Sequence, residues 1–218
     1  ATKIYNQYGN EAVSVVTNNP YKLADEIWGV GFKRADQIAE KLGFGHERYE
    51  RLRSGILYSL NKFSEEGHCF AYKDVLITTA AELLEVDSEI LDAPIEKMIT
   101  DKDLIAEKSF DDDENKIAIY LPVFYYSEVG TAKRLIRLIN ASRNTITGNI
   151  WLKENVFSNH KRIHYADKQI EAIEAAVNNK VLVLTGGPGT GKTTTTLGII
   201  ETYRSIGARI LLAAPTGR

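Results

Sequence analysis

A glycine-rich segment in the last part of the chain constrains the fold most strongly. Residues 186–193 read GGPGTGKT, which satisfies the phosphate-loop pattern G-x-x-x-x-G-K-[ST]. The preceding residues 181–184, Val-Leu-Val-Leu, form a continuous apolar run that is typical of a strand buried on both faces of a parallel sheet. A helix reaching about Ile206 follows the loop, Gly207 ends it, and residues 210–214 indicate a second buried strand. We therefore expect one βαβ unit in this region.

The order of residues in this loop suits the binding of a nucleoside triphosphate. Glycines let the backbone turn sharply and direct several N–H groups inward, and the following helix adds the positive end of its dipole. We expect Lys192 to reach the β- and γ-phosphates and the Thr193 hydroxyl to ligate Mg²⁺, which makes these two the candidate catalytic residues. The alternative is a glycine-rich turn that matches by chance, and the flanking strand and helix argue against it.

A glutamine upstream of the loop is a candidate for reading the nucleotide base. Gln169 lies on a helix predicted over residues 165–178, ahead of the first predicted strand. Its amide offers a donor and an acceptor side by side, which is the pattern needed to read the edge of an adenine. Most glutamines on helices are simply solvated, so this interpretation depends on the position of Gln169 ahead of a phosphate loop.

Two glycines flanking one apolar residue lie between two short predicted helices in the first part of the chain. Residues 28–32, Trp-Gly-Val-Gly-Phe, separate helices predicted over residues 21–27 and 34–42, and a third helix is predicted over residues 49–63. A tight reversal of this kind turns free N–H groups outward at a helix start, where a nucleic-acid phosphate can dock without regard to base sequence. The alternative is a helix–turn–helix joint whose glycines serve steric needs only. The candidate DNA-contacting residues are Gly29, Val30, Gly31, Lys33 and Arg34.

Composition limits the class of protein. The 218 residues are 44% hydrophobic and 26% charged, which is enough for real cores and excludes low-complexity disorder. The longest apolar stretch, residues 117–126, contains Pro122 and is too short to span a bilayer. The single cysteine, Cys69, allows no internal disulfide, and with no basic-then-apolar leader we expect a cytoplasmic protein. His160 and His164 share a helical spacing but have no acidic or thiol partner, so we expect no metal cluster there.

The formal net charge of −2 hides an uneven distribution of charge along the chain. Residues 1–70 carry nine basic and nine acidic side chains, residues 71–127 carry five and fourteen, and residues 128–218 carry thirteen and six. The three blocks therefore have net charges of 0, −9 and +7, which sum to −2. Chance fluctuation is the alternative, but the blocks coincide with predicted structural boundaries. The average charge thus gives no argument against a polyanionic partner.

The acidic block mixes predicted helices and strands. Thr79 followed by Glu82 is the pattern of a capping box at a helix start. The predicted elements are helices over residues 79–84 and 90–99 and strands over residues 104–108 and 116–121. Helices followed by a hairpin are the order of a winged-helix module. We expect the acidic turn at residues 111–115 to be solvated rather than to bind a cation. The net charge argues against DNA contact here and favours packing against the rest of the protein or against a basic partner protein.

The basic block begins with a helix predicted over residues 128–139. Its apolar side chains at helical spacing, expected to face inward, are Val129, Ala132, Leu135, Ile136 and Ile139. A connector with little periodicity follows over residues 140–164 and leads into the helix that carries Gln169.

The combination of these motifs resembles the RecD-type superfamily 1 DNA helicases, and more closely the long RecD-like proteins found outside the RecBCD complex. The resemblance rests on the helix-hairpin-helix around residues 27–31, the acidic winged-helix-like segment, the phosphate loop, and residues 214–218, Ala-Pro-Thr-Gly-Arg. It implies a mixed α and α/β fold: a helical helix-hairpin-helix domain, a winged-helix-like segment, and a partial RecA-like βαβ unit. The implied domains are a DNA-binding domain over residues 1–70, an acidic module over residues 71–127, a helix and connector over residues 128–164, and the start of an ATPase motor over residues 165–218.

The resemblance also implies an activity and site residues. The parent protein would be an ATP-driven 5′→3′ DNA helicase that uses ATP and Mg²⁺, with Gln169 as the adenine-reading glutamine. The implied triphosphate cradle is Gly187, Pro188, Gly189, Thr190, Gly191, Lys192, Thr193 and Thr194. The implied contacts to single-strand phosphates are Pro215, Thr216, Gly217 and Arg218.

Members of this family also need a later carboxylate pair and an arginine from a second RecA-like domain. The sequence ends at Arg218 before either, so we expect a fragment with negligible DNA-stimulated ATP hydrolysis of its own. The alternative is a stand-alone DNA-binding and regulatory module with a non-hydrolysing nucleotide site. Two buried-type strands without sheet neighbours expose apolar faces, so we expect residues 181–214 to be poorly ordered or to pair with another copy of the chain.

Overall fold

The computed structural model describes residues 2–27, 29–108, 116–141 and 165–214. It divides into two compact units, Ala1–Gly130 and Thr131–Arg218. Helix α8 (Pro122–Asn140) begins in the first unit and ends in the second. None of the helices in the described ranges is long and apolar enough to cross a membrane.

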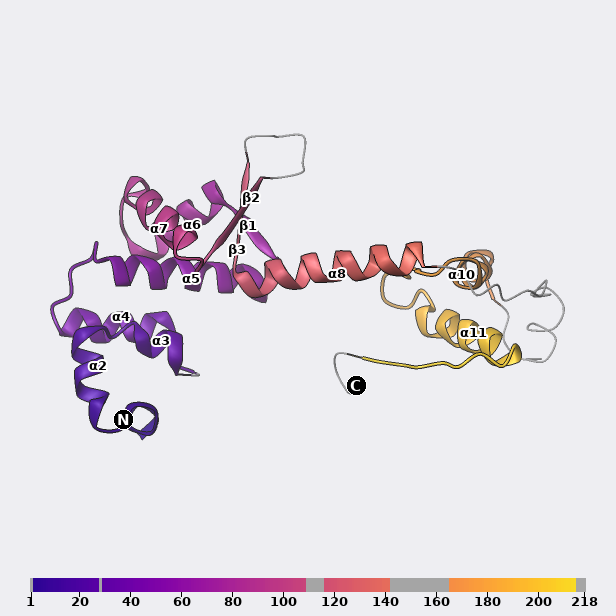
Figure 1. The fold of residues 1–218 in the computed structure, drawn as a ribbon, viewed down its shortest axis with the longest axis horizontal. Helices are drawn as coiled ribbons and strands as arrows, with labels where there is room; N and C mark the ends of the chain where they lie inside the picture. The colour runs from indigo at the N-terminus through magenta and orange to yellow at the C-terminus, as the bar shows by residue number, and fades with distance from the viewer. Residues whose placement is uncertain (1, 28, 109–115, 142–164, 215–218) are drawn as a thin grey trace. The chain divides into compact units, whose positions relative to one another are not determined.

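The first unit is mostly helical and contains one small sheet (Figure 1). Its elements before α8 are α1 (Thr2–Tyr8), the 3₁₀ turn η1 (Gly9–Glu11), α2 (Ala12–Asn18), α3 (Lys22–Glu26), α4 (Phe32–Lys41), α5 (Tyr49–Glu65), β1 (Phe70–Tyr72), α6 (Lys73–Leu84), the 3₁₀ turn η2 (Ser88–Leu91), α7 (Asp92–Thr100), β2 (Ile105–Lys108) and β3 (Ile117–Tyr120). The helices expected over residues 21–27, 34–42 and 49–63 are confirmed as α3, α4 and α5, and the expected strands as β2 and β3.

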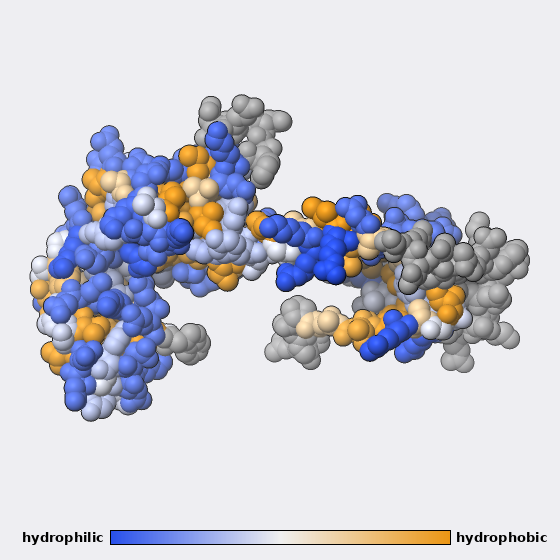
Figure 2. Space-filling model, in the orientation of Figure 1, coloured by the Kyte–Doolittle hydropathy of each residue, from blue (hydrophilic) through white to orange (hydrophobic). Residues whose placement is uncertain are grey.

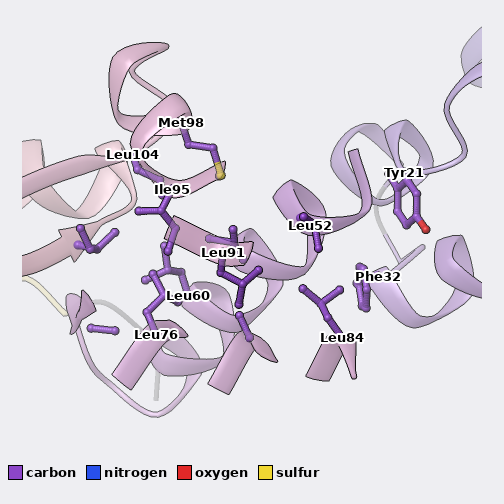
Figure 3. Packing of buried hydrophobic residues seen from close by; sticks show 14 of the residues in the cluster. Tyr21, Phe32, Leu52, Leu60, Leu76, Leu84, Leu91, Ile95, Met98 and Leu104 are labelled. Carbon is purple, nitrogen blue, oxygen red and sulfur yellow. The ribbon is translucent and has the colours of Figure 1, made fainter. Parts of the chain in front are cut away.

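Helix α5 is central to one hydrophobic core that joins the first 70 residues to the segment that follows them. Its buried Leu52, Ile56 and Leu60 belong to the same cluster as Phe32 of α4 and Leu84 of α6. The cluster also includes Leu76 of α6 and Ile95 and Met98 of α7, whose side chains converge in the close-up view (Figure 3). Burial of these side chains supplies the main stabilisation of the unit.

The strands form an antiparallel sheet in the order β1-β3-β2. Ala71 pairs with Ile119, and both side chains are buried in the core. Because successive side chains of a strand point to opposite faces, Phe70, Tyr72 and Tyr120 lie on the face away from that core. The sheet therefore has one apolar face toward the core cluster and one aromatic face on the opposite side.

A polar network ties α4, α5 and α6 together. Arg51 of α5 makes a two-point ion pair with Asp36 of α4, with Nε–Oδ1 2.8 Å and Nη2–Oδ2 3.0 Å. Its Nη1 also donates to the carbonyl oxygens of Leu84, at 2.9 Å, and His46, at 3.1 Å. The Tyr21 hydroxyl donates to Asp36 Oδ1 at 2.7 Å. Burial opposes ionisation of Asp36, but the hydrogen bonds from Arg51 and Tyr21 outweigh it and lower the pKa of the carboxyl.

The second unit contains the end of α8 together with α10 (Asp167–Asn178) and α11 (Lys192–Ser205), which pack against each other. Gly198 of α11 permits a close approach, since a Cβ there would lie 2.6 Å from Ile173 Cδ1 of α10. The Tyr203 hydroxyl donates to the Ala176 carbonyl oxygen at 2.7 Å and adds a polar link between the helices. These two helices match the expectations for residues 165–178 and for the helix after the phosphate loop.

The two buried strands expected in this unit do not form. Residues 181–184 and 210–214 have no strand assignment, and no hydrogen bond between described backbone groups joins them. Val183 is 78% exposed, Leu211 81% and Leu212 75%, and Figure 2 shows apolar side chains along the segment that approaches the C-terminus. An apolar run specifies a buried strand only where neighbouring strands supply backbone partners, and the described residues supply none. The expected βαβ unit is thus present only as its helix, although the exposed apolar faces agree with the expectation for unpartnered strands.

Two predicted helix starts are wrong. Helix α6 begins at Lys73, so Thr79 lies inside it and donates to the Val75 carbonyl oxygen at 2.9 Å instead of capping. Helix α8 begins at Pro122, where proline suits the first helical position because its missing N–H needs no partner. The inward face expected for α8 is also wrong: the described side chains Leu135, Ile136 and Ile139 are 39%, 57% and 58% exposed.

Candidate functional site

The phosphate loop turns through two left-handed glycines into the start of α11. Gly189 has φ +76° and Gly191 has φ +78°, a region that other residues adopt only with strain. Gly191 is the N-cap of α11, so the first free N–H groups of a 14-residue helix lie directly at the loop. No hydrogen bond to a described backbone carbonyl uses an N–H of residues 186–191. A loop with free donors at a helix N-terminus is suited to an anion.

The Lys192 side chain folds back over this loop. Its ammonium donates to the carbonyl oxygens of Gly186 and Gly187, each at 2.6 Å. The loop thereby holds the ammonium beside the free N–H groups, where it can exchange its carbonyl partners for phosphate oxygens. The Thr190 hydroxyl donates to the Gly187 carbonyl oxygen at 2.9 Å and fixes the loop from within.

The structure brings the Gln169 side chain next to the loop. Its Oε1 accepts a hydrogen bond from the Ala166 N–H at 3.0 Å, which caps the start of α10. Its Nε2 lies so close to Gly191 that a Cβ on that glycine would clash with it. Gly191 is therefore required both by its φ angle and by the neighbouring glutamine. The sequence pattern anticipated the glycine but not this contact.

The residues present fit a nucleoside triphosphate with Mg²⁺. The donor-lined loop and the Lys192 ammonium suit polyphosphate, and the exposed Thr193 hydroxyl at the start of α11 suits a hard cation held together with phosphate oxygens. Among the described residues, no three histidine, cysteine or acidic side chains gather into a site that could hold a metal by protein groups alone. A metal here would depend on the nucleotide for ligands.

The hairpin between α3 and α4 has the backbone expected of it. Gly29 has φ +87°, and Gly31 is the N-cap of α4. No hydrogen bond to a described backbone carbonyl uses the N–H of Gly31, Phe32 or Lys33. Lys33 is exposed, as is Arg34, so cationic side chains flank this helix start. The arrangement can hold a phosphate.

One cation beside the hairpin could not be found from the sequence. A Cβ on Gly29 would lie 3.4 Å from Lys3 Nζ, so α1 brings an ammonium next to the turn. The sequence carried no indication of this, because no helix was predicted before residue 21. A cavity of about 630 Å³ adjoins the hairpin on the side of α5. Asp25, Glu26 and Glu65 are among its lining residues, so a phosphate is expected at the helix start and not in this cavity.

Several candidate residues lie outside the described ranges. These are Trp28 of the hairpin, the acidic turn at residues 111–115, His160 and His164, and Pro215, Thr216, Gly217 and Arg218.

Comparison with known proteins gives matches at both ends of the chain. The family model for the helix-hairpin-helix domain of ATP-dependent RecD2 DNA helicases matches residues 1–70, and that for an AAA domain matches residues 169–218. The ATP-dependent RecD2 DNA helicase of Deinococcus radiodurans is 26% identical over 228 aligned residues, which cover 100% of this chain. The RecD subunit of the RecBCD enzyme of Mycobacterium tuberculosis is 48% identical over 59 residues, 24% of this chain and 10% of that protein.

The chain spans only 31% of the length of the Deinococcus protein. The aligned region nevertheless spans the whole chain, and with it the hairpin, the small sheet and the phosphate loop. The comparisons thus confirm the resemblance to RecD-type DNA helicases, from the helix-hairpin-helix domain to the phosphate loop.

Proposed function

We propose that this chain is part of an ATP-driven 5′→3′ DNA helicase, to which it contributes sequence-independent DNA binding and the nucleotide phosphate loop. The observation that carries the proposal is the loop at the start of α11, where free N–H groups, the Lys192 ammonium and the Gln169 amide converge. Such a site, on a chain that also resembles RecD-type helicases from end to end, fits ATP-dependent work on DNA better than nucleotide storage or signalling.

At the nucleotide, Lys192 bridges the β- and γ-phosphates and Thr193 ligates Mg²⁺. The backbone of Gly187, Pro188, Gly189, Thr190 and Gly191 cradles the phosphates, with Thr194 in the first turn of α11. Gln169 reads the adenine: its Nε2 is already turned toward the loop, and Oε1 keeps a second lone pair beside the one used by Ala166. A bound metal would supply positive charge against the negative charge that develops on the phosphates, and the protein groups would hold the nucleotide in place.

At the DNA, the N–H groups at the start of α4 hold one backbone phosphate of the strand. Lys33 and Arg34 add charge on either side, and the backbone of Gly29, Val30 and Gly31 lets the phosphate approach closely. Residues 215–218 hold further phosphates of a single strand. Contacts of this kind depend on salt but not on base sequence.

We also propose an acidic module over residues 71–127 between the DNA-binding segment and the motor segment, packed with residues 1–70 around one shared hydrophobic core. The elements α5, β1, α6, α7, β2 and β3 follow one another in the order helix, strand, helix, helix, strand, strand. This element order and the sheet order β1-β3-β2 are the grounds on which we propose a winged-helix-like segment. In the same proposal, residues 181–184 and 210–214 are strands of a RecA-like sheet that pair once neighbours are present, either in a longer chain or in a second copy.

Nucleotide binding is tested by titrating the 218-residue chain into a fluorescent ATP analogue with Mg²⁺ and following anisotropy. We expect saturable binding that Lys192→Ala weakens at least about tenfold, a difference of about 1.4 kcal/mol. Lys180→Ala, at a basic residue away from the loop, is the matched control and should leave the affinity unchanged. Equal affinities for the chain and the Lys192→Ala variant would overturn the nucleotide site.

DNA binding is tested with a fluorescein-labelled single-stranded oligonucleotide at low and at physiological salt. We expect the double variant Lys33→Ala/Arg34→Ala to weaken binding and to reduce its salt dependence, because two phosphate contacts are removed. Lys62→Ala, an exposed lysine of α5 paired with Glu65, serves as the control. No binding at low salt would leave the hairpin as an architectural joint, and equal losses in both variants would indicate a bulk charge effect.

A further inference from the structure

The outer face of the small sheet carries a chain of aromatic rings, which we call the aromatic face. It consists of Phe70, Tyr72, Tyr120, Tyr125 and Tyr126. Consecutive rings lie in contact: the centroids of Phe70 and Tyr72 are 5.3 Å apart, those of Phe70 and Tyr120 5.2 Å, those of Tyr120 and Tyr125 5.4 Å, and those of Tyr125 and Tyr126 5.5 Å. The rings come from β1, β3 and the first turn of α8, so tertiary structure assembles them.

These rings lie outside the main hydrophobic cluster, although Tyr120 is itself buried. The core takes the opposite face of the sheet, through Ala71 and Ile119. Tyr120 is buried beneath the other rings, Phe70, Tyr72 and Tyr125 are half-buried, and Tyr126 is 66% exposed. Four partly or largely exposed rings that contact one another around the buried Tyr120 form a surface suited to recognition.

Carboxylates lie beside the rings. Glu107 is opposite Ala118 in the sheet and therefore on the same face as Tyr120. Glu128 of α8 lies three residues after Tyr125 and therefore on the same side of that helix. Burial, followed by the negative charges of Glu128 and Glu107, raises the pKa of Tyr120 to about 12.

One ring of this face already contacts a cationic side chain of the same chain. The Lys116 ammonium lies 5.3 Å from the centroid of the Tyr72 ring, which is the geometry of a cation–π contact. The surrounding block, residues 71–127, has five basic and fourteen acidic side chains. Rings, carboxylates and a strongly negative block complement positive charge and repel a phosphate backbone.

We propose that the aromatic face is a docking surface for a lysine- or arginine-rich segment of a partner protein. Cationic side chains of that segment stack on the half-buried rings and pair with Glu107 and Glu128, while its aliphatic stems cover Tyr126. This proposal does not depend on the proposed helicase function, because the surface shares no residue with the phosphate loop or the hairpin.

A binding titration tests the proposal with the full chain. The probe is a short fluorescein-labelled peptide of alternating lysine and glycine, followed by anisotropy at physiological salt. We expect Tyr126→Ala and Glu128→Gln each to weaken binding at least about fivefold. Tyr5→Ala, at a tyrosine that is 62% exposed elsewhere on the unit, and Glu89→Gln, within the acidic block, are the matched controls and should change the affinity less than about twofold.

Three results would overturn the proposal. Equal losses for Glu128→Gln and Glu89→Gln would show that the whole acidic block attracts the peptide without a defined site. Undiminished binding after lysine acetylation of the peptide would show that positive charge is not what the surface recognises. Tight binding of a single-stranded oligonucleotide that Tyr126→Ala abolishes would identify the surface as a nucleic-acid platform instead. Circular dichroism of each variant confirms that it is folded, and nucleotide binding by the same variants should be unchanged.

Discussion

Replacing Gly55 by alanine should destabilise the protein, although alanine is the better helix former. Gly55 lies within α5 and is buried against α6. A Cβ at this position would lie 2.6 Å from Leu84 Cδ2 and 2.8 Å from both Cδ1 and Cγ, where an ordinary contact is 3.4–4 Å. Leu84 is fully buried, so its side chain has no solvent to move into. The clash must be relieved by a shift of α6 relative to α5.

The magnitude follows from two opposing terms. Alanine in place of glycine within a helix stabilises by about 1 kcal/mol. Overpacking a well-packed core costs about 1–3 kcal/mol, and contact with three atoms of one confined side chain points to the upper end of that range. We therefore expect Gly55→Ala to lower the free energy of unfolding by about 2 kcal/mol.

A second substitution makes this reasoning sharper. Leu84→Ala removes the three atoms with which the new methyl group clashes, at a cost of about 3 kcal/mol by itself. In that background Gly55→Ala should no longer destabilise and should instead stabilise by about 1 kcal/mol, because only the helix term remains. The effect of one substitution thus changes sign with the presence of its neighbour, which is strong non-additivity between contacting residues.

Urea denaturation followed by far-UV circular dichroism measures all four proteins of this cycle. Asn61→Ala, at an exposed position of the same helix, is the control and should change the free energy of unfolding by less than about 0.5 kcal/mol. If Gly55→Ala stabilised the unmodified chain, or if its effect were the same with and without Leu84, the close packing of α5 against α6 would be refuted.

Three further predictions concern the polar network and the loop. Arg51→Met removes the cation paired with the Asp36 carboxylate, which keeps only the Tyr21 hydroxyl as a donor, and it removes the side-chain donor to the Leu84 carbonyl. It should cost about 3 kcal/mol in urea denaturation, and a loss below about 1 kcal/mol would contradict this. Because the pKa of Asp36 is lowered on folding, its stabilisation is present above the unfolded pKa of about 3.9 and is lost as the pH falls below it. Asp36→Asn should therefore flatten the acid limb of a plot of stability against pH, and an unchanged limb would contradict the assignment. Gly191→Ala places a methyl group on a left-handed backbone position, where it clashes with Gln169. We expect this variant to bind a fluorescent ATP analogue at least about tenfold more weakly. Gly187→Ala, which has open space around it, should weaken binding less.

Local sequence was sufficient where an element is specified by its own residues. The periodicity of α4 and α5 and the hairpin glycines gave elements whose bounds lie within two residues of the structure. The phosphate loop was found for the same reason, since its glycines and lysine act within one turn of backbone. Local pattern did not reveal β1, because three residues carry no periodicity and become a strand only by pairing with β3, far along the chain.

The candidate sites also depend partly on local sequence and partly on tertiary structure. The sequence by itself determined the chemical groups available at the loop and hairpin: N–H groups at helix starts, an ammonium and a side-chain amide. Only tertiary structure placed Gln169 against Gly191, Lys3 beside Gly29, and the rings of β1, β3 and α8 on one face. It also decided that the apolar runs at residues 181–184 and 210–214 are not strands here, because a strand requires backbone partners that no residue can supply for itself. The chemistry of a side chain is set by the residue itself, whereas its burial, its pairing and its contacts depend on the neighbours that folding brings together.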